Sequence, residues 1–378
     1  MNIAIVCYPT YGGSGVVATE LGKSLAEKGH EIHFVTYSRP IRLGQFIQNV
    51  SFHEVSVRDY PLFEFPPYES ALTSTLVDVA LHHKLDLFHV HYAIPHASAA
   101  LAAKQILSSM GKNIPVITTL HGTDITLVGR DKSYLPVVKH SLEQSDGVTA
   151  VSKFLATETA AVFGTQKPIE FIPNFVDTLR FSRQNKEHFR RMIAPNEEKL
   201  IIHTSNFRKV KRVEDVVHVF HRITKNIPAK LLMVGDGPER SEAESLCRMY
   251  GLQDDVVFVG NQNPVEEIYS VGDLFLMPSA SESFGLSALE AMACGVPVVT
   301  SDAGGLPEIN LEGITGHLCP VGDIDSMAKR SMEILKDDAT WSKFSENARK
   351  QAENYHVDNI VPLYEEYYNS VLKLAIHR

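Results

Sequence analysis

Long apolar runs are missing from this chain of 378 residues. No stretch approaches the ~18 residues that a membrane-spanning helix needs, and the apolar start carries neither a basic region nor a cleavage site. We therefore expect a soluble, cytoplasmic protein without an integral membrane segment. Trp341 is the only tryptophan, so the Trp-rich amphipathic helix typical of a lipid-modifying enzyme is also missing.

Cysteine and net positive charge are scarce as well. The four cysteines, at positions 7, 247, 294 and 319, are scattered beside apolar stretches without a Cys-x-x-Cys pair, which indicates reduced structural thiols. The formal net charge is -9, whereas nucleic-acid binding needs a basic face, so we expect no nucleic-acid partner. A small anionic ligand stays compatible with this charge, because it needs only a few local cations or a helix N-terminus.

Short β-branched runs alternate with amphipathic helical patterns, which predicts βαβ units and parallel sheets covered by helices. Strands of the first series are expected at residues 2–8, 31–36, 87–91, 116–120 and 147–151. The pattern then restarts, with strands expected at residues 200–204, 230–234, 256–259, 274–277 and 296–300. The predicted fold class is therefore α/β, with two Rossmann-like doubly wound domains.

The connection between the two series is expected near Pro173, where an Ile-Pro-Asn-Phe-Val-Asp segment and the charged stretch 183–191 break the periodicity. We expect an N-terminal domain at 1–172, a C-terminal domain at 173–357 and a C-terminal helix at 358–378. That helix can cap either domain, and a return to the N-terminal domain is one of the two options.

A glycine-rich turn follows the first strand: Pro-Thr-Tyr-Gly-Gly-Ser-Gly at residues 9–15, with a helix beginning at once. Glycines let the backbone approach an anion, and the helix dipole favours negative charge there. Gly13, Gly15 and Ala18 also match a dinucleotide fingerprint. That fingerprint requires an acidic residue ending the second strand, where this chain has Thr-Tyr-Ser-Arg, so a dinucleotide cofactor is not expected. A tight turn without a ligand is the other alternative.

Two carboxylates lie eight residues apart, Glu282 in a loop after the strand at 274–277 and Glu290 in the helix that follows. From these positions Glu290 can reach ribose hydroxyls, and Glu282 can hold sugar hydroxyls at the mouth of the site. Backbone amides at the start of the helix suit a diphosphate. These amides belong to Ser283, Phe284, Gly285 and Leu286.

This Glu-x7-Glu spacing, followed by Ala-Met-Ala-Cys-Gly-Val-Pro-Val-Val at 291–299, resembles the donor site of retaining glycosyltransferases of family 4, which have the GT-B fold. The resemblance covers almost the whole chain. It implies a glycosyltransferase with its active site in a cleft between the domains. Residues 1–172 would then form the acceptor domain, and residues 173–357 the domain for a nucleotide-sugar donor.

The same resemblance implies donor contacts in the second domain. Lys211 matches a family lysine and is expected to grip the diphosphate, helped by Arg208. Asn206 departs from the pattern, since relatives usually carry arginine there. Gly235 begins a loop matched to the nucleoside side of the donor, and Gln262 is expected to read the uracil edge.

In the first domain, Thr-Thr-Leu-His-Gly-Thr-Asp at 118–124 matches the His-Gly-x-Asp motif of the family. His121 resembles the residue that holds the 6-hydroxyl of the transferred sugar. The resemblance therefore implies His121, Lys211 and Glu282 as catalytic residues, and Gly13 as a further donor contact.

A narrower resemblance comes from residues 1–15 and from His-Val-His-Tyr-Ala-Ile-Pro-His at 89–96, which are similar to the family members that begin bacillithiol synthesis. It implies UDP-N-acetylglucosamine as donor and L-malate as acceptor. Residues expected near the acceptor are Ser14, Tyr92 and Thr119. Candidates for the cation that pairs with the malate carboxylates are Arg58, Arg130 and Lys132.

Several alternatives stay open. The family resemblance implies neither metal nor other cofactor; His89, His91 and His96 make a metal site conceivable, but no carboxylate or cysteine completes it. Other functions are transfer of the same sugar to another small acceptor such as inositol phosphate, a UDP-N-acetylglucosamine 2-epimerase, and a non-catalytic nucleotide-sugar binding subunit. The residues leave the oligomeric state open, a homo-oligomer included.

Overall fold

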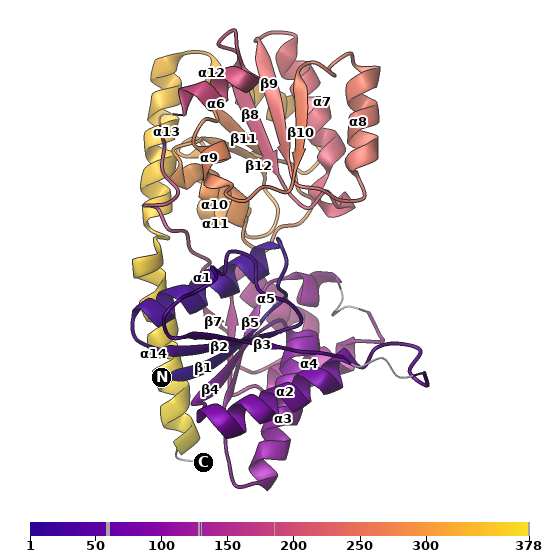
Figure 1. Ribbon diagram of the computed structural model, residues 1–378. Helices are drawn as coiled ribbons and strands as arrows, with labels where there is room; N and C mark the ends of the chain where they lie inside the picture. The colour runs from indigo at the N-terminus through magenta and orange to yellow at the C-terminus, as the bar shows by residue number, and fades with distance from the viewer. Residues whose placement is uncertain (58–60, 128, 130, 185, 377–378) are drawn as a thin grey trace. The chain divides into compact units, whose positions relative to one another are not determined.

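The computed structural model of the chain describes residues 1–57, 61–127, 129, 131–184 and 186–376. These residues form two compact units, shown in Figure 1. One unit comprises Met1–Pro173 together with the chain from Asp358 onward, and the other comprises Asn174–Val357. Each unit is built around a parallel sheet of its own, and we describe the two separately.

In the first unit, the described residues form a parallel sheet with the strand order β3-β2-β1-β4-β5-β6-β7. The order runs in opposite directions from the neighbouring strands β1 and β4, so the carboxyl ends of these strands mark a topological switch point, where α/β proteins bind ligands. The strands are β1 (Asn2–Val6), β2 (Glu31–Thr36), β3 (Val50–Glu54), β4 (Leu87–His91), β5 (Val116–Leu120), β6 (Gly147–Ala150) and β7 (Glu170–Phe171).

Helices cover both faces of this sheet. On one face, buried side chains of α2 and α3 pack against Ala4, Val6 and Val90. On the other face lies α1, where a Cβ atom at Gly22 would come within 2.4 Å of the Phe34 ring, so glycine brings this helix close to β2. The helices are α1 (Gly13–Glu27), α2 (Tyr68–His83), α3 (Ser98–Ser109), α4 (Leu135–Gln144) and α5 (Lys153–Phe163).

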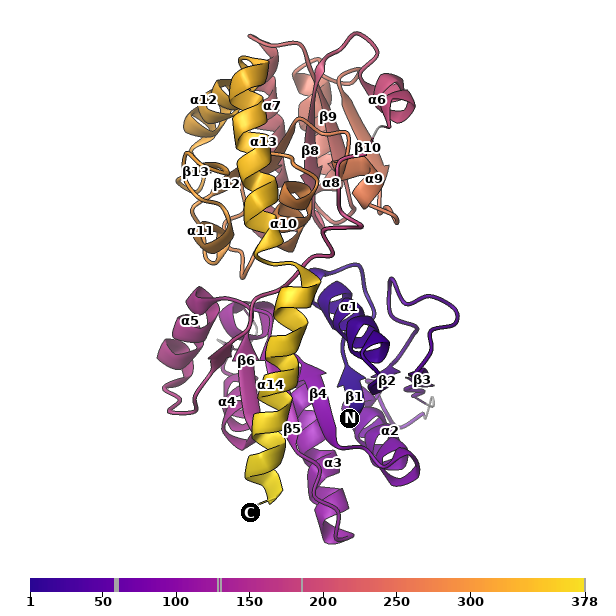
Figure 2. The same cartoon turned by 90° about the vertical axis from the view of Figure 1, so that its left-hand side faces the viewer.

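The last helix, α14 (Val357–Ile376), packs on the first unit and runs along its sheet (Figure 2). The Tyr367 hydroxyl accepts a hydrogen bond of 2.9 Å from the Val148 amide in β6. The Tyr368 hydroxyl lies 2.7 Å from Nδ1 of His89 in β4. Buried hydroxyls that find partners in the sheet hold a helix in one register, because an unpaired polar group there would be costly.

The described residues of the second unit form another parallel sheet, with the order β10-β9-β8-β11-β12-β13. Val213, Val216, Val217 and Phe220 recur at helical spacing on α7 and lie in its hydrophobic core. The strands are β8 (Lys199–Thr204), β9 (Ala229–Val234), β10 (Val256–Gly260), β11 (Leu274–Met277), β12 (Val298–Ser301) and β13 (Gly316–Cys319). The helices are α6 (Glu187–Ile193), α7 (Val213–Thr224), α8 (Arg240–Met249), α9 (Glu266–Tyr269), α10 (Leu286–Ala293), α11 (Leu306–Ile309), α12 (Ile324–Leu335) and α13 (Asp338–Glu353).

The predicted α/β class with two parallel sheets is confirmed. The structure adds β3, β7 and β13 to the predicted strands, and the charged stretch after residue 183 contains helix α6. β3 lies at the sheet edge and reads Val-Ser-Phe-His-Glu with partly exposed residues, so it lacks the continuous apolar run of a buried strand. Among the described residues, none of the helices has the length and apolarity to cross a membrane.

Candidate active site

A tight turn at the carboxyl end of β1 leads directly into α1. A Cβ atom at Gly15 would lie 2.2 Å from the carbonyl oxygen of Tyr8, so the turn requires glycine there. Gly13 is exposed and begins the helix, and Ser14 is half-buried. The turn therefore presents the first backbone amides of a 15-residue helix at the switch point, a geometry that suits an anionic ligand.

Tyr92 connects this turn to the loop after β5. Its phenol lies near the polar side chains of Ser14 from the turn and Thr123 from the loop, both of which favour the ionised form. Burial raises the pKa of Tyr92 to about 12, so the phenol stays protonated at neutral pH. Its backbone φ of 87° is unfavourable for a residue with a side chain. Two of the predicted acceptor residues, Ser14 and Tyr92, thus lie near each other.

His121 lies just beyond the carboxyl end of β5 and pairs with a ring from β4. Its Nε2 is 2.8 Å from Nδ1 of His91, and the two rings stack with centroids 5.0 Å apart. Burial lowers the pKa of His121 to about 3 and that of His91 well below its usual value, so both rings are neutral at physiological pH. Nδ1 is the His121 nitrogen outside this contact, and it is the one that would reach a sugar hydroxyl.

Asp124 holds the loops after β4 and β5 together. Oδ2 accepts a hydrogen bond from the Ala93 amide at 3.0 Å, and Oδ1 accepts one from the Gly122 amide at 3.0 Å. Burial raises the pKa of Asp124 to about 6, although these amides act in the opposite direction. Asp124 ends the predicted His-Gly-x-Asp motif, but this role was not predicted for it. A carboxylate four residues beyond a buried strand was the available signal.

Thr119 is fully buried, which bears on its predicted contact with the acceptor. Its hydroxyl lies 2.7 Å from Nε2 of His89 and 2.7 Å from the Thr149 hydroxyl. His89 in turn contacts the Tyr368 hydroxyl, so the threonine belongs to a chain of buried polar groups inside the sheet. In this arrangement its hydroxyl forms hydrogen bonds with residues of the neighbouring strands β4 and β6, and its contact with the acceptor stays a prediction.

At the conceivable metal site formed by His89, His91 and His96, most of the ring nitrogens already have hydrogen-bond partners. His89 contacts Thr119 and Tyr368, and Nδ1 of His91 contacts His121. Nε2 of His91 and Nε2 of His96 are buried without a partner among the described residues. Two nitrogens do not make a three-ligand set, and within the described part of the chain no such set includes these histidines.

In the second unit, the loops after β8 and β9 touch backbone to backbone. A Cβ atom at Gly235 would lie 1.8 Å from the Ser205 carbonyl oxygen, and one at Gly237 would lie 2.2 Å from the Asn206 carbonyl oxygen. Gly235 also has φ of 116°, a conformation that favours glycine. Asn206 is exposed on this surface, so its side chain is accessible to a ligand.

Lys211 and Glu282 meet across two loops at the carboxyl ends of β8 and β11. Nζ of Lys211 donates a hydrogen bond to Oε1 of Glu282, which also accepts one from the Ser279 hydroxyl at 3.1 Å. The backbone joins the same loops, because the Ala280 amide donates to the Val210 carbonyl at 2.8 Å. Lys211 was predicted to bind the diphosphate and Glu282 to hold the sugar, whereas the ion pair between them was not predicted.

The loop from Ser283 to Leu286 turns into α10 at Gly285, whose φ is 95°. The neighbouring chain lies very close: a Cβ atom at Gly304 would come within 1.9 Å of the Glu282 carbonyl oxygen. Glu290 is the fifth residue of α10 and is 5% exposed, while Phe284 is buried. The pair Gly304 and Gly305 between β12 and α11 was not predicted to matter, although a Gly-Gly pair between a strand and a helix is a signal of a turn.

Three further candidates, Arg208, Gln262 and Lys132, lie on the surface. Arg208 and Gln262 are exposed, and the Gln262 side-chain amide donates to the Val259 carbonyl at 2.5 Å. Among the acceptor cations, Lys132 is exposed, whereas Arg58 and Arg130 lie outside the described residues. The four cysteines are free and buried, in keeping with structural thiols.

Two family profiles together match most of the chain. "Glycosyltransferase Family 4" matches residues 11–180, and "Glycosyl transferases group 1" matches residues 184–351. The N-acetyl-alpha-D-glucosaminyl L-malate synthase of Bacillus anthracis is 46% identical over 375 residues, which cover 99% of this chain and 98% of that protein. The chain belongs to the family 4 glycosyltransferases. The resemblance inferred from its motifs is thereby confirmed.

Two solved structures share the fold of this glycosyltransferase. Sucrose-phosphate synthase from Thermosynechococcus elongatus matches with a TM-score of 0.82 at 22% identity, over 99% of this chain and 100% of that chain. HepE from Anabaena, in complex with UDP and glucose, matches with a TM-score of 0.83 at 21% identity, over 98% of this chain and 100% of that chain. The two Rossmann-like units of the glycosyltransferase are therefore those of the GT-B fold.

Proposed function

We propose that this glycosyltransferase moves N-acetylglucosamine from UDP-N-acetylglucosamine to the hydroxyl of L-malate, with retention of configuration, and releases UDP. The observation that carries the proposal is the 46% identity to an N-acetyl-alpha-D-glucosaminyl L-malate synthase over essentially the full length of both chains. Products would be N-acetylglucosaminyl-α-malate and UDP, formed in the cytoplasm as an early step of bacillithiol synthesis.

The donor half of the proposal rests on the second unit. Lys211 supplies the positive charge next to the amides at the start of α10, and together they are suited to a diphosphate. Glu290 is proposed to accept hydrogen bonds from the ribose hydroxyls. Asn206, Gly235 and Gln262 are proposed to surround the nucleoside, with Arg208 assisting at the phosphates.

The acceptor half rests on the first unit. Ser14 and Tyr92 lie near each other at the switch point, and Ser14 is the second residue of α1. Hydroxyl and amide donors are the groups that carboxylates of a small acceptor require. His121 is proposed to hold the 6-hydroxyl of the sugar with its neutral ring, so that the anomeric carbon faces the malate hydroxyl.

We propose a front-face displacement as the chemical step. The bond between the anomeric carbon and the β-phosphate oxygen breaks, the malate hydroxyl oxygen bonds to the same face of that carbon, and its proton passes to the departing diphosphate. Positioning and stabilisation of the diphosphate charge by Lys211 and the α10 amides would lower the barrier. A double displacement is not supported, because both carboxylate oxygens of Asp124, three residues after His121, already accept hydrogen bonds from backbone amides.

No metal takes part in the proposed step, since Lys211 and the amides at the start of α10 would stabilise the negative charge of the diphosphate. The test is UDP release from UDP-N-acetylglucosamine with EDTA present, on addition of L-malate, inositol phosphate or no acceptor. We expect release only with malate. Release with inositol phosphate instead would overturn the acceptor and keep the donor site, whereas turnover without acceptor would favour a 2-epimerase.

A further inference from the structure

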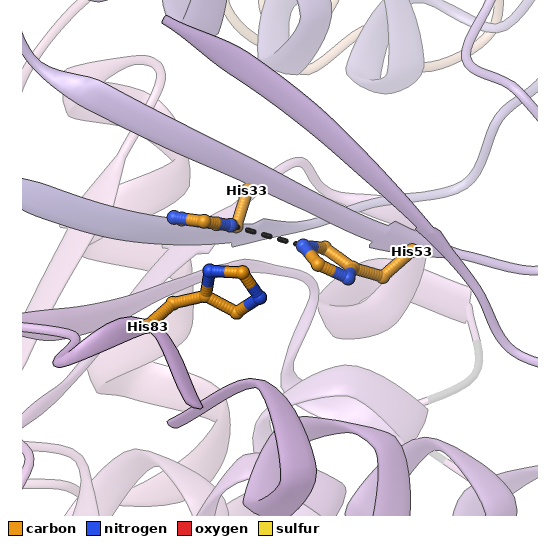
Figure 3. Close-up of side chains that lie close together, drawn as sticks. All are labelled: His33, His53 and His83. Carbon is orange, nitrogen blue, oxygen red and sulfur yellow. Dashed lines mark hydrogen bonds between the residues drawn. The ribbon is translucent and has the colours of Figure 1, made fainter. Parts of the chain in front are cut away.

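Three histidines from separate elements of the first unit gather at one edge of its sheet. His33 lies in β2, His53 lies in the edge strand β3, and His83 is the last residue of α2 (Figure 3). Each ring offers one nitrogen, and these three nitrogens lie within 4.8 Å of one another. The residues are separated by 20 and 30 positions in the chain, so only the fold brings them together.

The spacing of the rings is close to what a tetrahedral metal requires. Nδ1 of His33 is 2.9 Å from Nε2 of His53, and the His83 ring centroid is 4.6 Å from that of His33 and 5.1 Å from that of His53. Zinc–nitrogen bonds of 2.0–2.1 Å place tetrahedral ligand atoms about 3.3 Å apart. The first pair needs to open by a few tenths of an ångström, and the exposed His83 ring at the helix end is free to move inward.

The side chain of Asn2 orients the His33 ring in the way that neighbouring oxygens orient metal-bound histidines. Nε2 of His33 lies 2.9 Å from Oδ1 of Asn2, an oxygen that only accepts, so His33 carries its proton on Nε2. Its Nδ1 therefore presents a lone pair toward His53 and the interior of the cluster. Metal-bound histidines commonly donate their second ring nitrogen to such an oxygen, which settles tautomer and ring orientation.

The charge state also suits a ligand role. Burial, the proximity of His53 and that of His83 lower the pKa of His33 to about 4, and burial likewise lowers the pKa of His53. Neutral rings have the lone pair that a metal needs. In the contact between His33 and His53, the shared proton is on Nε2 of His53. When a cation takes the place of this proton, His53 can carry its proton on Nδ1 instead.

We propose that His33, His53 and His83 form a binding site for one divalent transition metal of the zinc class. Three imidazoles select borderline cations such as Zn(II), Co(II) and Ni(II) over Mg(II) and Ca(II), which prefer oxygen. His33 is buried, His53 is half-buried and His83 is exposed, so the cation enters past His83 and a water takes the fourth position. The bound metal ties the edge strand β3 to β2 and to the end of α2.

This site lies apart from the residues proposed for sugar transfer. His33 is the third residue of β2, and α2 ends at the amino-terminal edge of the sheet, because it runs back from the strand ends. Gly13, Tyr92 and His121 follow the carboxyl ends of their strands. The metal therefore stabilises the first unit and takes no part in the reaction, and its test does not depend on donor or acceptor.

The experiment titrates tag-free, EDTA-stripped full-length protein with Zn(II) by calorimetry and with Co(II) by absorption. His53→Gln and His83→Gln are compared with His82→Gln, a neighbouring exposed histidine whose Nδ1 contacts the Asp78 carbonyl at 2.8 Å. We expect one equivalent bound by the wild type and by His82→Gln, and at least tenfold weaker binding by the other two. Zinc should raise the unfolding temperature in the same two proteins only.

Circular dichroism of the metal-free variants shows whether each is folded, and His83→Gln, at an exposed helix end, keeps the test valid if His53→Gln does not fold. The proposal is overturned if the wild type binds no equivalent, if His83→Gln binds as the wild type does, or if His82→Gln weakens binding equally. Mg(II) at the same concentrations is the negative control, and tight Mg(II) binding would also contradict it.

Discussion

Lys211 and Glu282 form an ion pair that joins the loops after β8 and β11, although 71 residues separate them in the chain. The lysine is 21% exposed and the carboxylate 12%, so the pair is only partly shielded from water. A diphosphate placed beside Lys211 would compete with Glu282 for the same ammonium group. The carboxylate would then be released toward sugar hydroxyls, which reconciles the two predicted roles with the observed contact.

Lys211→Ala should weaken UDP binding by about 10- to 100-fold, because a charge-assisted contact to phosphate contributes about 1.5–3 kcal/mol. Turnover should fall further, since the charge on UDP grows as it departs. Calorimetric titration with UDP and steady-state kinetics check this. Lys209→Ala is the matched control, a lysine two positions away that is exposed, and it should change both quantities little.

Glu290→Ala should weaken UDP binding about tenfold or more through the loss of an acceptor for the ribose hydroxyls. Glu290→Gln keeps the size and one acceptor oxygen, so it should lie between the wild type and Glu290→Ala. Affinity for UDP, compared with affinity for uracil or pyrophosphate, locates the effect on the ribose. If neither Glu290→Ala nor Lys211→Ala changes UDP affinity, the donor site is assigned wrongly.

Asp124→Ala should lower kcat/KM for malate while leaving UDP affinity within about twofold. Removal of the carboxylate leaves the Ala93 and Gly122 amides without their partner, which costs about 2 kcal/mol of unfolding free energy and loosens the loops that carry Tyr92 and His121. Asp124→Asn retains one acceptor oxygen and should show smaller losses. Kinetics and urea unfolding measure both effects, and full activity of Asp124→Ala would refute this positioning role.

Tyr368→Phe should destabilise the protein by about 1–3 kcal/mol, because the substitution leaves Nδ1 of fully buried His89 without its partner. The effect would show that α14 is required for the stability of the first unit. Urea unfolding followed by circular dichroism is the measurement. Tyr134→Phe, at an exposed tyrosine, should change the free energy by less than about 0.5 kcal/mol, and equal effects of the two would contradict the prediction.

Acid should destabilise the protein through histidines that are buried in the neutral form. Burial lowers the pKa of His89 to about 3 in the folded state, against about 6.5 in an unfolded chain. The unfolded state therefore binds more protons between these values, so stability is fully present above pH 6.5 and falls as the pH drops toward 3. His89 alone accounts for about 2 kcal/mol between pH 7 and pH 5. Unfolding free energies at the two pH values test this, and a stability that rises on acidification would contradict the sign.

Much of the proposed donor site could be assembled from the sequence because its residues lie close together in the chain. The carboxylates of Glu282 and Glu290 lie within one loop and helix, and the glycines of the β1 turn are required by backbone geometry that five or six residues determine. The strand expected at residues 274–277 was predicted for the same reason, since a buried parallel strand is a continuous apolar run.

What the sequence pattern missed has a physical cause in each case. Edge strand β3 is half-exposed and polar, so no continuous apolar run marks it. The contacts of the Thr119 hydroxyl with His89 and Thr149 were not predicted, because they join three strands that are about 30 residues apart in the chain, and its acceptor contact stays a prediction. The role of Asp124 could not be predicted from its motif, because it depends on a hydrogen bond from the Ala93 amide, 31 residues away in the chain.

The sequence by itself determined the two parallel α/β units, because strand periodicity, glycine turns and helix starts are encoded within short windows. The glycosyltransferase family followed from the resemblance of its motifs, and the same resemblance supplied the residues of the proposed donor site. Tertiary structure alone decided which side chains meet: Lys211 with Glu282, His91 with His121, and the cluster of His33, His53 and His83. Such contacts join residues that are 20 to 71 positions apart, and they follow from strand order and helix packing, which no single window of sequence contains.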